Sequence, residues 1–288
     1  MVFHIVDVFA EQKYSGNQLA VVLKAGSLST DEMQAIAQEM HFSETTFVLS
    51  EKPRDGGYDV RIFTPAEEVP FAGHPTLGTA HVIQHHIIGR DVNRVTLNLK
   101  IGQIPVTFDP DGILWMDQVE PAFGQRLAPA QLAPVLGLDE DAIDPRFPIE
   151  EVSTGLPHII VPLQDLAALK QASINRDRYF ALIETTWAKP ILIFCPGGYT
   201  DQQALGVRMF ADCFGIAEDP ATGSGNGCLA GYLVRHRYFG DDAIDISTGQ
   251  GYEVGRPSTL YLQAEATEAS IDVRVGGRVV DVAKGQLS

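Results

Sequence analysis

A loose internal repeat is the feature of this sequence that most restricts its fold. One copy runs from Arg61-Ile62-Phe63-Thr64-Pro65 to Gly73-His74-Pro75-Thr76-Leu77-Gly78-Thr79-Ala80, and the other from Arg208-Met209-Phe210-Ala211-Asp212 to Gly223-Ser224-Gly225-Asn226-Gly227-Cys228-Leu229-Ala230. Each copy has an Arg-x-Phe strand, an acidic-Pro stretch, a glycine turn and a helix of small residues, with three extra residues in the second copy. The offset of 150 residues between Gly73 and Gly223 is close to half the chain. A duplication gives such an offset, so we expect two related domains.

Short β-rich segments outnumber helices along the chain. Strands are predicted for residues 5–9, 19–23, 46–49, 58–63, 95–99 and 104–108, where β-branched and aromatic residues stand between turn residues. The capping box Ser29-Thr30-Asp31-Glu32 predicts the first helix, with Leu28 placed to contact Met33. This mixture favours an α+β fold over a parallel doubly wound sheet. We expect one domain over residues 1–115 and a second over 116–277, with a final strand at about 278–288 packing back onto the first.

Charge and cysteine content narrow the classes of function. The net charge of −16 disfavours nucleic acid and anionic membrane surfaces, which demand clustered Lys and Arg. The segment Met1–Phe9 has the pattern of a strand and not of a signal peptide, and no apolar run reaches the length of a membrane span. Cys195, Cys213 and Cys228 lack metal-type spacing. We therefore expect a cytoplasmic protein with reduced thiols and without structural zinc.

Two glycine turns that lead into predicted helices are candidate seats for a carboxylate. At Gly73–Thr76, a helix start with Pro near its first position presents N–H groups and the positive end of the dipole. Asp219–Gly227 repeats this arrangement with glycines that let a ligand approach the backbone. The alternatives are an ordinary buried helix start with a hydrogen-bonded His74, and a purely structural turn. A nucleotide is disfavoured, because Cys228 replaces the Walker Lys and the glycine spacing is not that of a dinucleotide fingerprint.

Glu44 is the candidate proton carrier. It stands between the first predicted helix and the apolar run Thr46-Phe47-Val48, where desolvation would raise the pKa of a carboxyl group and suit it to taking and returning a proton. The alternative is that Glu44 caps a strand or points to water.

Two other catalytic classes fit poorly. A dithiol racemase needs Cys before each helix-opening glycine, and Ala72 and Thr222 stand there. The cysteines have no neighbouring His in the sequence, so buried packing is expected for them. A serine hydrolase is disfavoured because Gly223-Ser224-Gly225 lacks the nucleophile-elbow pattern.

A set of motifs extends over nearly the whole chain. They are Ser15-Gly16-Asn17-Gln18-Leu19-Ala20-Val21-Val22, Ser43-Glu44-Thr45-Thr46-Phe47, Arg61-Ile62-Phe63-Thr64-Pro65, Glu68-Val69-Pro70-Phe71-Ala72-Gly73-His74-Pro75-Thr76-Leu77-Gly78, Ser153-Thr154-Gly155, Arg208-Met209-Phe210, Glu218-Asp219-Pro220-Ala221-Thr222-Gly223-Ser224, and Gln250-Gly251 with Gly255-Arg256-Pro257-Ser258. In content and order these motifs resemble the PhzF-like family, which is related in fold to diaminopimelate epimerase.

The resemblance implies two similar domains, each a β-barrel-like sheet around a central helix, with the active site in the cleft between them, and a homodimer. It implies isomerisation of a dihydro-hydroxyanthranilate without metal or organic cofactor. On the matching positions, Glu44 would move the proton, and His74, Asp219 and Ser224 would bind substrate and assist proton delivery. Asn17 and the backbone of Gly73 and Gly223 would complete substrate binding, with the glycines holding the carboxylate.

One departure from the family pattern and one alternative function follow from this comparison. Many relatives are Ala-rich where this chain has Gly225-Asn226-Gly227-Cys228, so we expect a looser helix start and a ligand of altered shape. The alternative function is a PhzF-like protein that binds a small metabolite or regulates a partner without catalysis.

Overall fold

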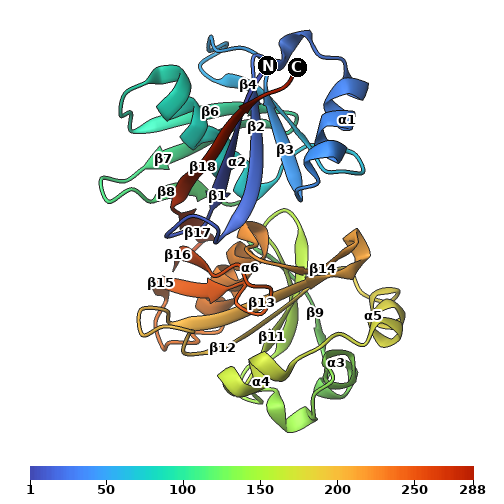
Figure 1. The fold of residues 1–288 in the computed structure, drawn as a ribbon. Coiled ribbons are helices and arrows are strands. Elements are labelled where there is room, and N and C mark those ends of the chain that lie inside the picture. Colours follow the sequence, from blue (N-terminus) through green and yellow to red (C-terminus); the bar gives the residue numbers. More distant parts are fainter. The chain divides into compact units, whose positions relative to one another are not determined.

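The computed structural model describes residues 1–288, which form two compact units. Unit 1 consists of Met1–Asp117 and Gly276–Ser288, and unit 2 of Gln118–Val275. In each unit a curved sheet wraps around one buried helix, α2 (Gly73–Val82) in unit 1 and α6 (Gly223–Arg235) in unit 2 (Figure 1). The fold is α+β with two similar domains, as the sequence predicted. No helix is both long and apolar enough to cross a membrane.

Unit 1 is built on eight principal strands. They are β1 (Val2–Val8), β2 (Asn17–Leu23), β3 (Glu44–Val48), β4 (Tyr58–Phe63), β6 (Arg94–Leu99), β7 (Gly102–Phe108), β8 (Leu114–Asp117) and β18 (Val279–Gln286), with the short β5 (Glu68–Val69) beside β4. Their order is β18-β1-β2-β3-β4-β6-β7-β8, and only the pairs β2–β3 and β4–β6 are parallel. Helix α2 contacts strands from both ends of this order, so the sheet closes around it.

Unit 2 repeats this plan. Its strands are β9 (Ala122–Leu127), β10 (Ile149–Ser153), β11 (Pro157–Pro162), β12 (Ile191–Pro196), β13 (Leu205–Ala211), β14 (Ile216–Asp219), β15 (Ala243–Gln250) and β16 (Ser258–Ala266), followed by β17 (Ile271–Gly277). The order is β9-β10-β11-β12-β13-β15-β16, with β11–β12 and β13–β15 parallel and the short β14 beside β13. The parallel pairs therefore occupy equivalent places in the two units.

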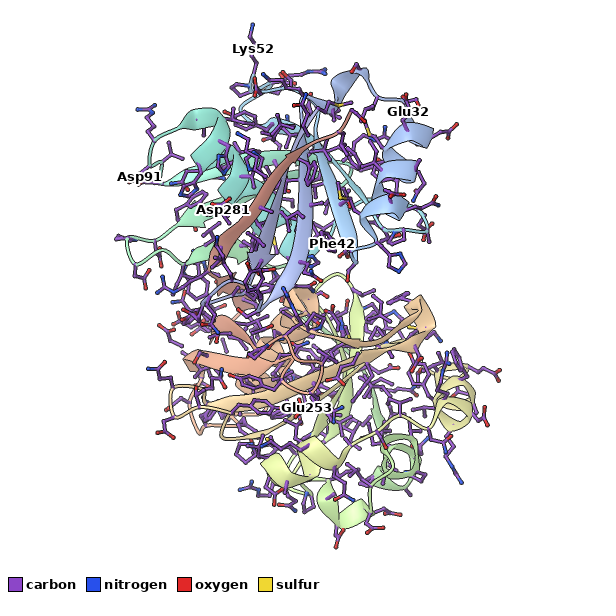
Figure 2. The ribbon with its side chains drawn as sticks, in the orientation of Figure 1. Glu32, Phe42, Lys52, Asp91, Glu253 and Asp281 are labelled. Atoms are coloured by element: carbon purple, nitrogen blue, oxygen red, sulfur yellow. The ribbon has the colours of Figure 1, made fainter.

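Apart from α2 and α6, the chain has further helical segments, one of which directly continues α2. Unit 1 has α1 (Thr30–Met40), the 3-10 turn η1 (Ala25–Ser27) and the π-helical turn η2 (Ile83–Ile88), and unit 2 has α3 (Pro129–Leu136), α4 (Leu166–Gln171), α5 (Arg176–Ile183) and the 3-10 turns η3 (Glu140–Ala142) and η4 (Asp212–Phe214). Helix α1 begins with the predicted capping box, in which the side chains of Ser29 and Glu32 each accept a hydrogen bond from the other's backbone N–H. Glu32 lies on the exposed side of α1 (Figure 2). Leu28 packs against the buried cluster that contains Met33, as the sequence predicted.

The Arg-x-Phe repeat forms the same clamp in both units. Arg61 of β4 donates two hydrogen bonds of 2.8 Å to Glu68 of β5, and its guanidinium lies 5.0 Å from the ring centroid of Phe63. Arg208 of β13 donates bonds of 3.0 and 2.8 Å to Glu218 of β14 and lies 4.9 Å from Phe210. The three extra residues of the second copy fall between Arg208 and Glu218, where η4 is found.

Candidate active site

Unit 1 brings Glu44 and His74 together. Glu44 is the first residue of β3 and pairs with Leu19 of β2, while His74 is the second residue of α2. The His74 Nε2 atom lies 3.4 Å from Glu44 Oε2, and the two side chains are only 7% and 18% exposed. The sequence predicted both residues as site residues, and the structure places them side by side.

His74 is held in its neutral form. Burial lowers the pKa of its imidazole to about 3, although a hydrogen bond to the Gln18 backbone favours the protonated ring. A hydrogen bond that favours the protonated ring is one that the ring donates, so the His74 ring donates to the Gln18 carbonyl oxygen. The Nε2 atom is buried, makes no hydrogen bond and lies 3.4 Å from Glu44 Oε2. A neutral imidazole nitrogen therefore lies beside the Glu44 carboxyl group.

The start of α2 offers backbone donors. Its N-cap residue, Ala72, is extended and has no side chain that could cap the helix. The N–H groups of Gly73 and His74 lie in the first turn, at the positive end of the helix dipole, and Pro75 has no N–H to satisfy. Thr76 Oγ1 donates to the Ala72 carbonyl at 2.7 Å, which fixes the turn. This helix start has the features of an anion-binding site.

Asn17 lies at the beginning of β2, opposite Val8 of β1, and is 3% exposed. The preceding Gly16 has φ +67°, and a Cβ there would lie 2.3 Å from the Val8 carbonyl oxygen. Only glycine allows this left-handed turn so close to β1. The Ser15-Gly16-Asn17 motif is therefore a tight turn that fixes the position of Asn17.

In unit 2, Asp219 ends β14 and is 7% exposed. Its carboxylate accepts a hydrogen bond of 2.5 Å from the Thr222 hydroxyl, and Thr222 is the N-cap of α6. Gln250, the last residue of β15, donates to the Asp219 carbonyl at 2.8 Å and to Thr222 Oγ1 at 3.0 Å. Asp219 is thus joined to the helix start and to a neighbouring strand.

Asn226 extends this buried network. It donates to Gln250 Oε1 at 2.9 Å and to the Thr222 carbonyl at 3.1 Å, and it accepts a bond of 2.8 Å from Thr248. Asn226, Thr248 and Gln250 are fully buried. The expectation of a looser helix start at Gly225–Cys228 was wrong, because Asn226 ties the first turn of α6 to β15. The sequence analysis named Gln250 only as part of a family motif and did not predict that its side chain would join Asp219, Thr222 and Asn226.

The glycines of α6 serve close packing. A Cβ on Gly225 would lie 2.9 Å from Leu192 Cδ1 and 3.3 Å from His158 Nε2. Gly223 is buried as the first residue of α6, and Ser224, half-buried, is the second. Ser224 therefore occupies in α6 the place that His74 occupies in α2.

None of the cysteines stands at a helix entrance. The N-cap residues of α2 and α6 are Ala72 and Thr222, which have no thiol. Cys195 and Cys228 are buried, as expected, whereas Cys213 is only partly buried. Cys228 Sγ lies 3.6 Å from His158 Nδ1, a neighbour that the sequence did not indicate, but burial raises the pKa of its thiol to about 11. A thiol with that pKa is a poor nucleophile at neutral pH.

A family model described as "phenazine biosynthesis-like protein" (PhzC-PhzF) matches residues 6–285. This chain belongs to the PhzC-PhzF family. Among its relatives, the Pseudomonas aeruginosa protein named trans-2,3-dihydro-3-hydroxyanthranilate isomerase is 37% identical over 98% of this chain and 97% of its own. The Pseudomonas fluorescens protein of the same name is 36% identical over 98% of each chain.

Solved structures of PhzC-PhzF relatives share the fold. The PhzF-family protein of Bacillus anthracis has a TM-score of 0.91 and 26% identity, over 100% of this chain and 99% of its own. A predicted epimerase of Pseudomonas aeruginosa has a TM-score of 0.81 and 32% identity, over 99% and 98% of the two chains. A probable proline racemase of Agrobacterium radiobacter, at 11% identity and a TM-score of 0.63 over 100% and 92%, shares the fold alone.

Proposed function

We propose that this PhzC-PhzF chain is an isomerase that moves a proton between carbon atoms of a small carboxylate-bearing substrate, of the trans-2,3-dihydro-3-hydroxyanthranilate isomerase type. Two relatives at 37% and 36% identity over 98% of this chain carry that name. The observation that carries the proposal is the contact of 3.4 Å between Glu44 Oε2 and His74 Nε2 in buried surroundings. It supplies a proton carrier with a neutral partner beside it.

In the proposed reaction, the Glu44 carboxylate takes a proton from one carbon of the substrate. The electrons of that C–H bond shift into the conjugated system, and a second carbon takes the proton back, so that no atom or electron is gained or lost. Neutral His74 accepts a hydrogen bond from the protonated Glu44 and keeps the proton at the site between the two steps. General acid–base catalysis of this kind contributes roughly 10²–10⁴-fold to a rate.

The substrate carboxylate is proposed to bind at backbone N–H groups of Gly73 and Gly223, because both residues open helices whose N-caps make no side-chain capping bond. Asn17, Asp219 and Ser224 would hold the rest of the substrate, with Asp219 assisting proton delivery. The buried bonds that hold Asp219 support a fixed position for it. A homodimer, which the family resemblance implies, and a cytoplasmic location, which the cysteine content and the strand-like segment Met1–Phe9 led us to expect, are part of the proposal.

Deuterium incorporation tests this function. Trans-2,3-dihydro-3-hydroxyanthranilate and related cyclic amino acids are incubated in heavy water with wild type, Glu44→Gln and the control Glu39→Gln, whose carboxylate is exposed on α1. NMR should detect deuterium at a carbon position with wild type and with the control, and none with Glu44→Gln, while Glu44→Gln still binds the compound. Saturable binding without exchange in wild type would instead support the non-catalytic metabolite-binding alternative.

A further inference from the structure

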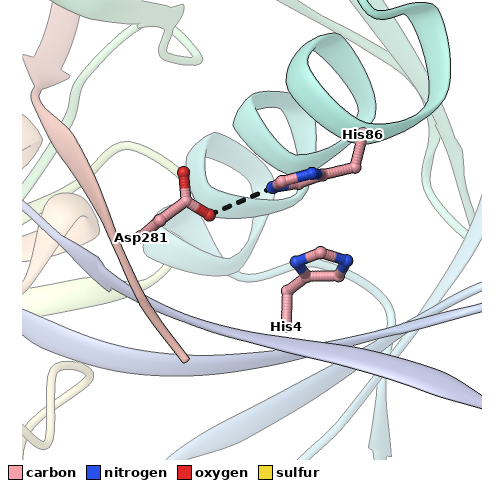
Figure 3. Close-up of side chains that lie close together, drawn as sticks. All are labelled: His4, His86 and Asp281. Carbon is pink, nitrogen blue, oxygen red and sulfur yellow. Dashed lines mark hydrogen bonds and ion pairs between the residues drawn. The ribbon is translucent and has the colours of Figure 1, made fainter. Parts of the chain in front are cut away.

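A cluster of histidines around one aspartate lies in unit 1 and has no part in the proposed reaction. His4 of β1, His86 of η2 and Asp281 of β18 converge so that their ligand atoms all lie within 4.8 Å of one another (Figure 3). His86 Nε2 is 3.2 Å from Asp281 Oδ1, and the ring of His4 stacks on that of His86 at 3.9 Å. Segments from both ends and from the first third of the chain thus contribute to one group of donors.

The π-helical turn η2 places His86 in this cluster. In a regular α-helix, side chains five residues apart point in directions about 140° apart. The wider turn, in which Gly89 N–H bonds to the Gln84 carbonyl five residues earlier, brings such residues closer together. His81 and His86 accordingly contact the two oxygens of the same carboxylate, with His81 Nε2 at 3.0 Å from Asp281 Oδ2. Single π-turns of this kind occur frequently at functional sites.

A β-bulge places Asp281 in the cluster. In the antiparallel pair of β1 and β18, Ile5 is opposite Ala283 but Val6 is opposite Asp281, so Val282 is the extra residue. Cross-strand partners point to the same face of a sheet, and His4 and Val6 share a face because they are two residues apart. The bulge therefore turns Asp281 to the face of His4, whereas regular pairing would place it on the opposite face.

We propose that His4, His86 and Asp281 bind a divalent transition-metal ion of the Zn²⁺ class, with His81 orienting the Asp281 carboxylate. Two imidazoles and one carboxylate form a common ligand set for such ions, and a water molecule completes four-coordination. Ligand atoms on tetrahedral Zn²⁺ lie roughly 3.3–3.5 Å apart. The contact of 3.2 Å between His86 and Asp281 is close to that spacing, and the His4 nitrogen, which lies within 4.8 Å of the other two ligand atoms, needs to approach by at most about 1.5 Å.

The accessibility of the donors fits an ion that enters from solvent. The side chain of Asp281 is 47% exposed and that of His86 31%, whereas His4 is buried at 2%. The hydrogen bond from His81 supplies the outer-shell partner that metal-bound carboxylates commonly have. Lys284, opposite His4 in the ladder, is a nearby positive charge that weakens the affinity for a cation. A bound ion would connect β1, β18 and η2.

The test is a titration of the EDTA-treated full chain with Co²⁺, followed by visible absorption, and with Zn²⁺, followed by calorimetry. Wild type should bind one ion per chain with micromolar affinity and show the visible bands of cobalt with imidazole ligands. His86→Gln and Asp281→Asn should each weaken binding at least ~10-fold. His85→Gln is the matched control, because His85 lies on the same turn, bonds to the His81 carbonyl and is outside the ligand set. It should bind as wild type does.

A second control separates this site from the candidate active site. Glu44→Gln should bind the ion as wild type does, because Glu44 contacts His74 and does not belong to the cluster. Zn²⁺ should also raise the Tm of wild type and of His85→Gln but not that of His86→Gln. The proposal is overturned if wild type binds no Co²⁺ or Zn²⁺ at millimolar concentration, or if His86→Gln and Asp281→Asn bind as tightly as wild type.

Discussion

The helices α2 and α6 begin in the same way, but the side chains around the two starts differ. In α2, Thr76 bonds to the carbonyl of the N-cap residue Ala72, and in α6 Asn226 bonds to the carbonyl of the N-cap residue Thr222. Beyond this shared turn, unit 1 has an imidazole nitrogen that makes no hydrogen bond and lies 3.4 Å from a carboxyl oxygen. Unit 2 has a carboxylate held in a buried network. The two starts therefore share a backbone plan but differ in their side chains, with a neutral imidazole beside a carboxyl group in unit 1 and a hydrogen-bonded carboxylate in unit 2.

The Arg–Glu clamps of the two units also differ, in how deeply the arginine side chain is buried and in which groups it contacts. Arg61 has a side chain that is 25% exposed and donates additionally to Thr30 and to the Met33 sulfur. Arg208 is 8% exposed and donates additionally to the carbonyls of Leu169 and Ala172 around the end of α4. The clamp of unit 2 is therefore more deeply integrated into its core.

The largest expected effect is on kcat, and it distinguishes a substitution near the start of α2 from one near the start of α6. Glu44→Gln should lower kcat by roughly 10²–10⁴-fold with little change in KM, because the amide binds but does not carry a proton. Asp219→Asn should lower kcat less and raise KM, because the amide keeps an oxygen for Thr222 but loses the charge. Steady-state kinetics on the compound identified by deuterium exchange measures both. Equal losses of kcat with unchanged KM in both variants would show that the two starts share the proton chemistry.

The second expected effect compares the clamps by stability. Arg208→Met should lower the free energy of unfolding by about 3–5 kcal/mol, because Glu218 is left buried and unpaired. Arg61→Met should cost only about 1–2 kcal/mol, because Glu68 is more exposed. Urea unfolding measures this, with Trp115 reporting on unit 1 and Trp187 on unit 2 in single-tryptophan variants. A larger loss for Arg61→Met would contradict the deeper integration of the unit 2 clamp.

The smallest expected effect is on the pH dependence of the free energy of unfolding, to which one buried histidine in each unit should contribute alike. Burial lowers the pKa of His74 in unit 1 to about 3 and that of His158 in unit 2 to about 4. The unfolded chain takes up these protons at its ordinary pKa of about 6.5, so the free energy of unfolding falls as the pH drops from 6.5 towards 4 and is unaffected above 7. At pH 5 each group contributes a loss of at most about 2 kcal/mol.

Measuring the free energy of unfolding at pH 7 and at pH 5 checks whether it falls as the pH drops. His74→Gln and His158→Gln should each reduce the difference between the two pH values by about 1–2 kcal/mol, since glutamine does not titrate. Wild type and both variants are compared under the same salt conditions. If neither substitution changes the difference, the two imidazoles are not the source of the acid sensitivity.

Local signals in the sequence predicted much of this molecule. The Ser29–Glu32 capping box, the strand at Tyr58–Phe63 and the glycine-opened helices depend on residues close together in the chain, and the structure contains all of them. The contact of Gln250 with Asn226 depends on the register of β15 against α6, which no local pattern encodes. The convergence on Asp281 depends on a π-turn and a bulge, two irregularities without a signature in a single sequence.

Strand β18 has a consequence for the order in which the protein can fold during synthesis. It completes unit 1 by pairing with β1, and the dark red strand lies beside the dark blue one in Figure 1. The ribosome makes β18 only after every residue of unit 2, whose own chain is continuous. Unit 2 can therefore fold before the last strand of unit 1 has been made. Until then, the backbone of β1 is unpaired along the edge that β18 later occupies. Of the strands of unit 1, β1 is therefore made before the others and is fully paired only when β18 is added.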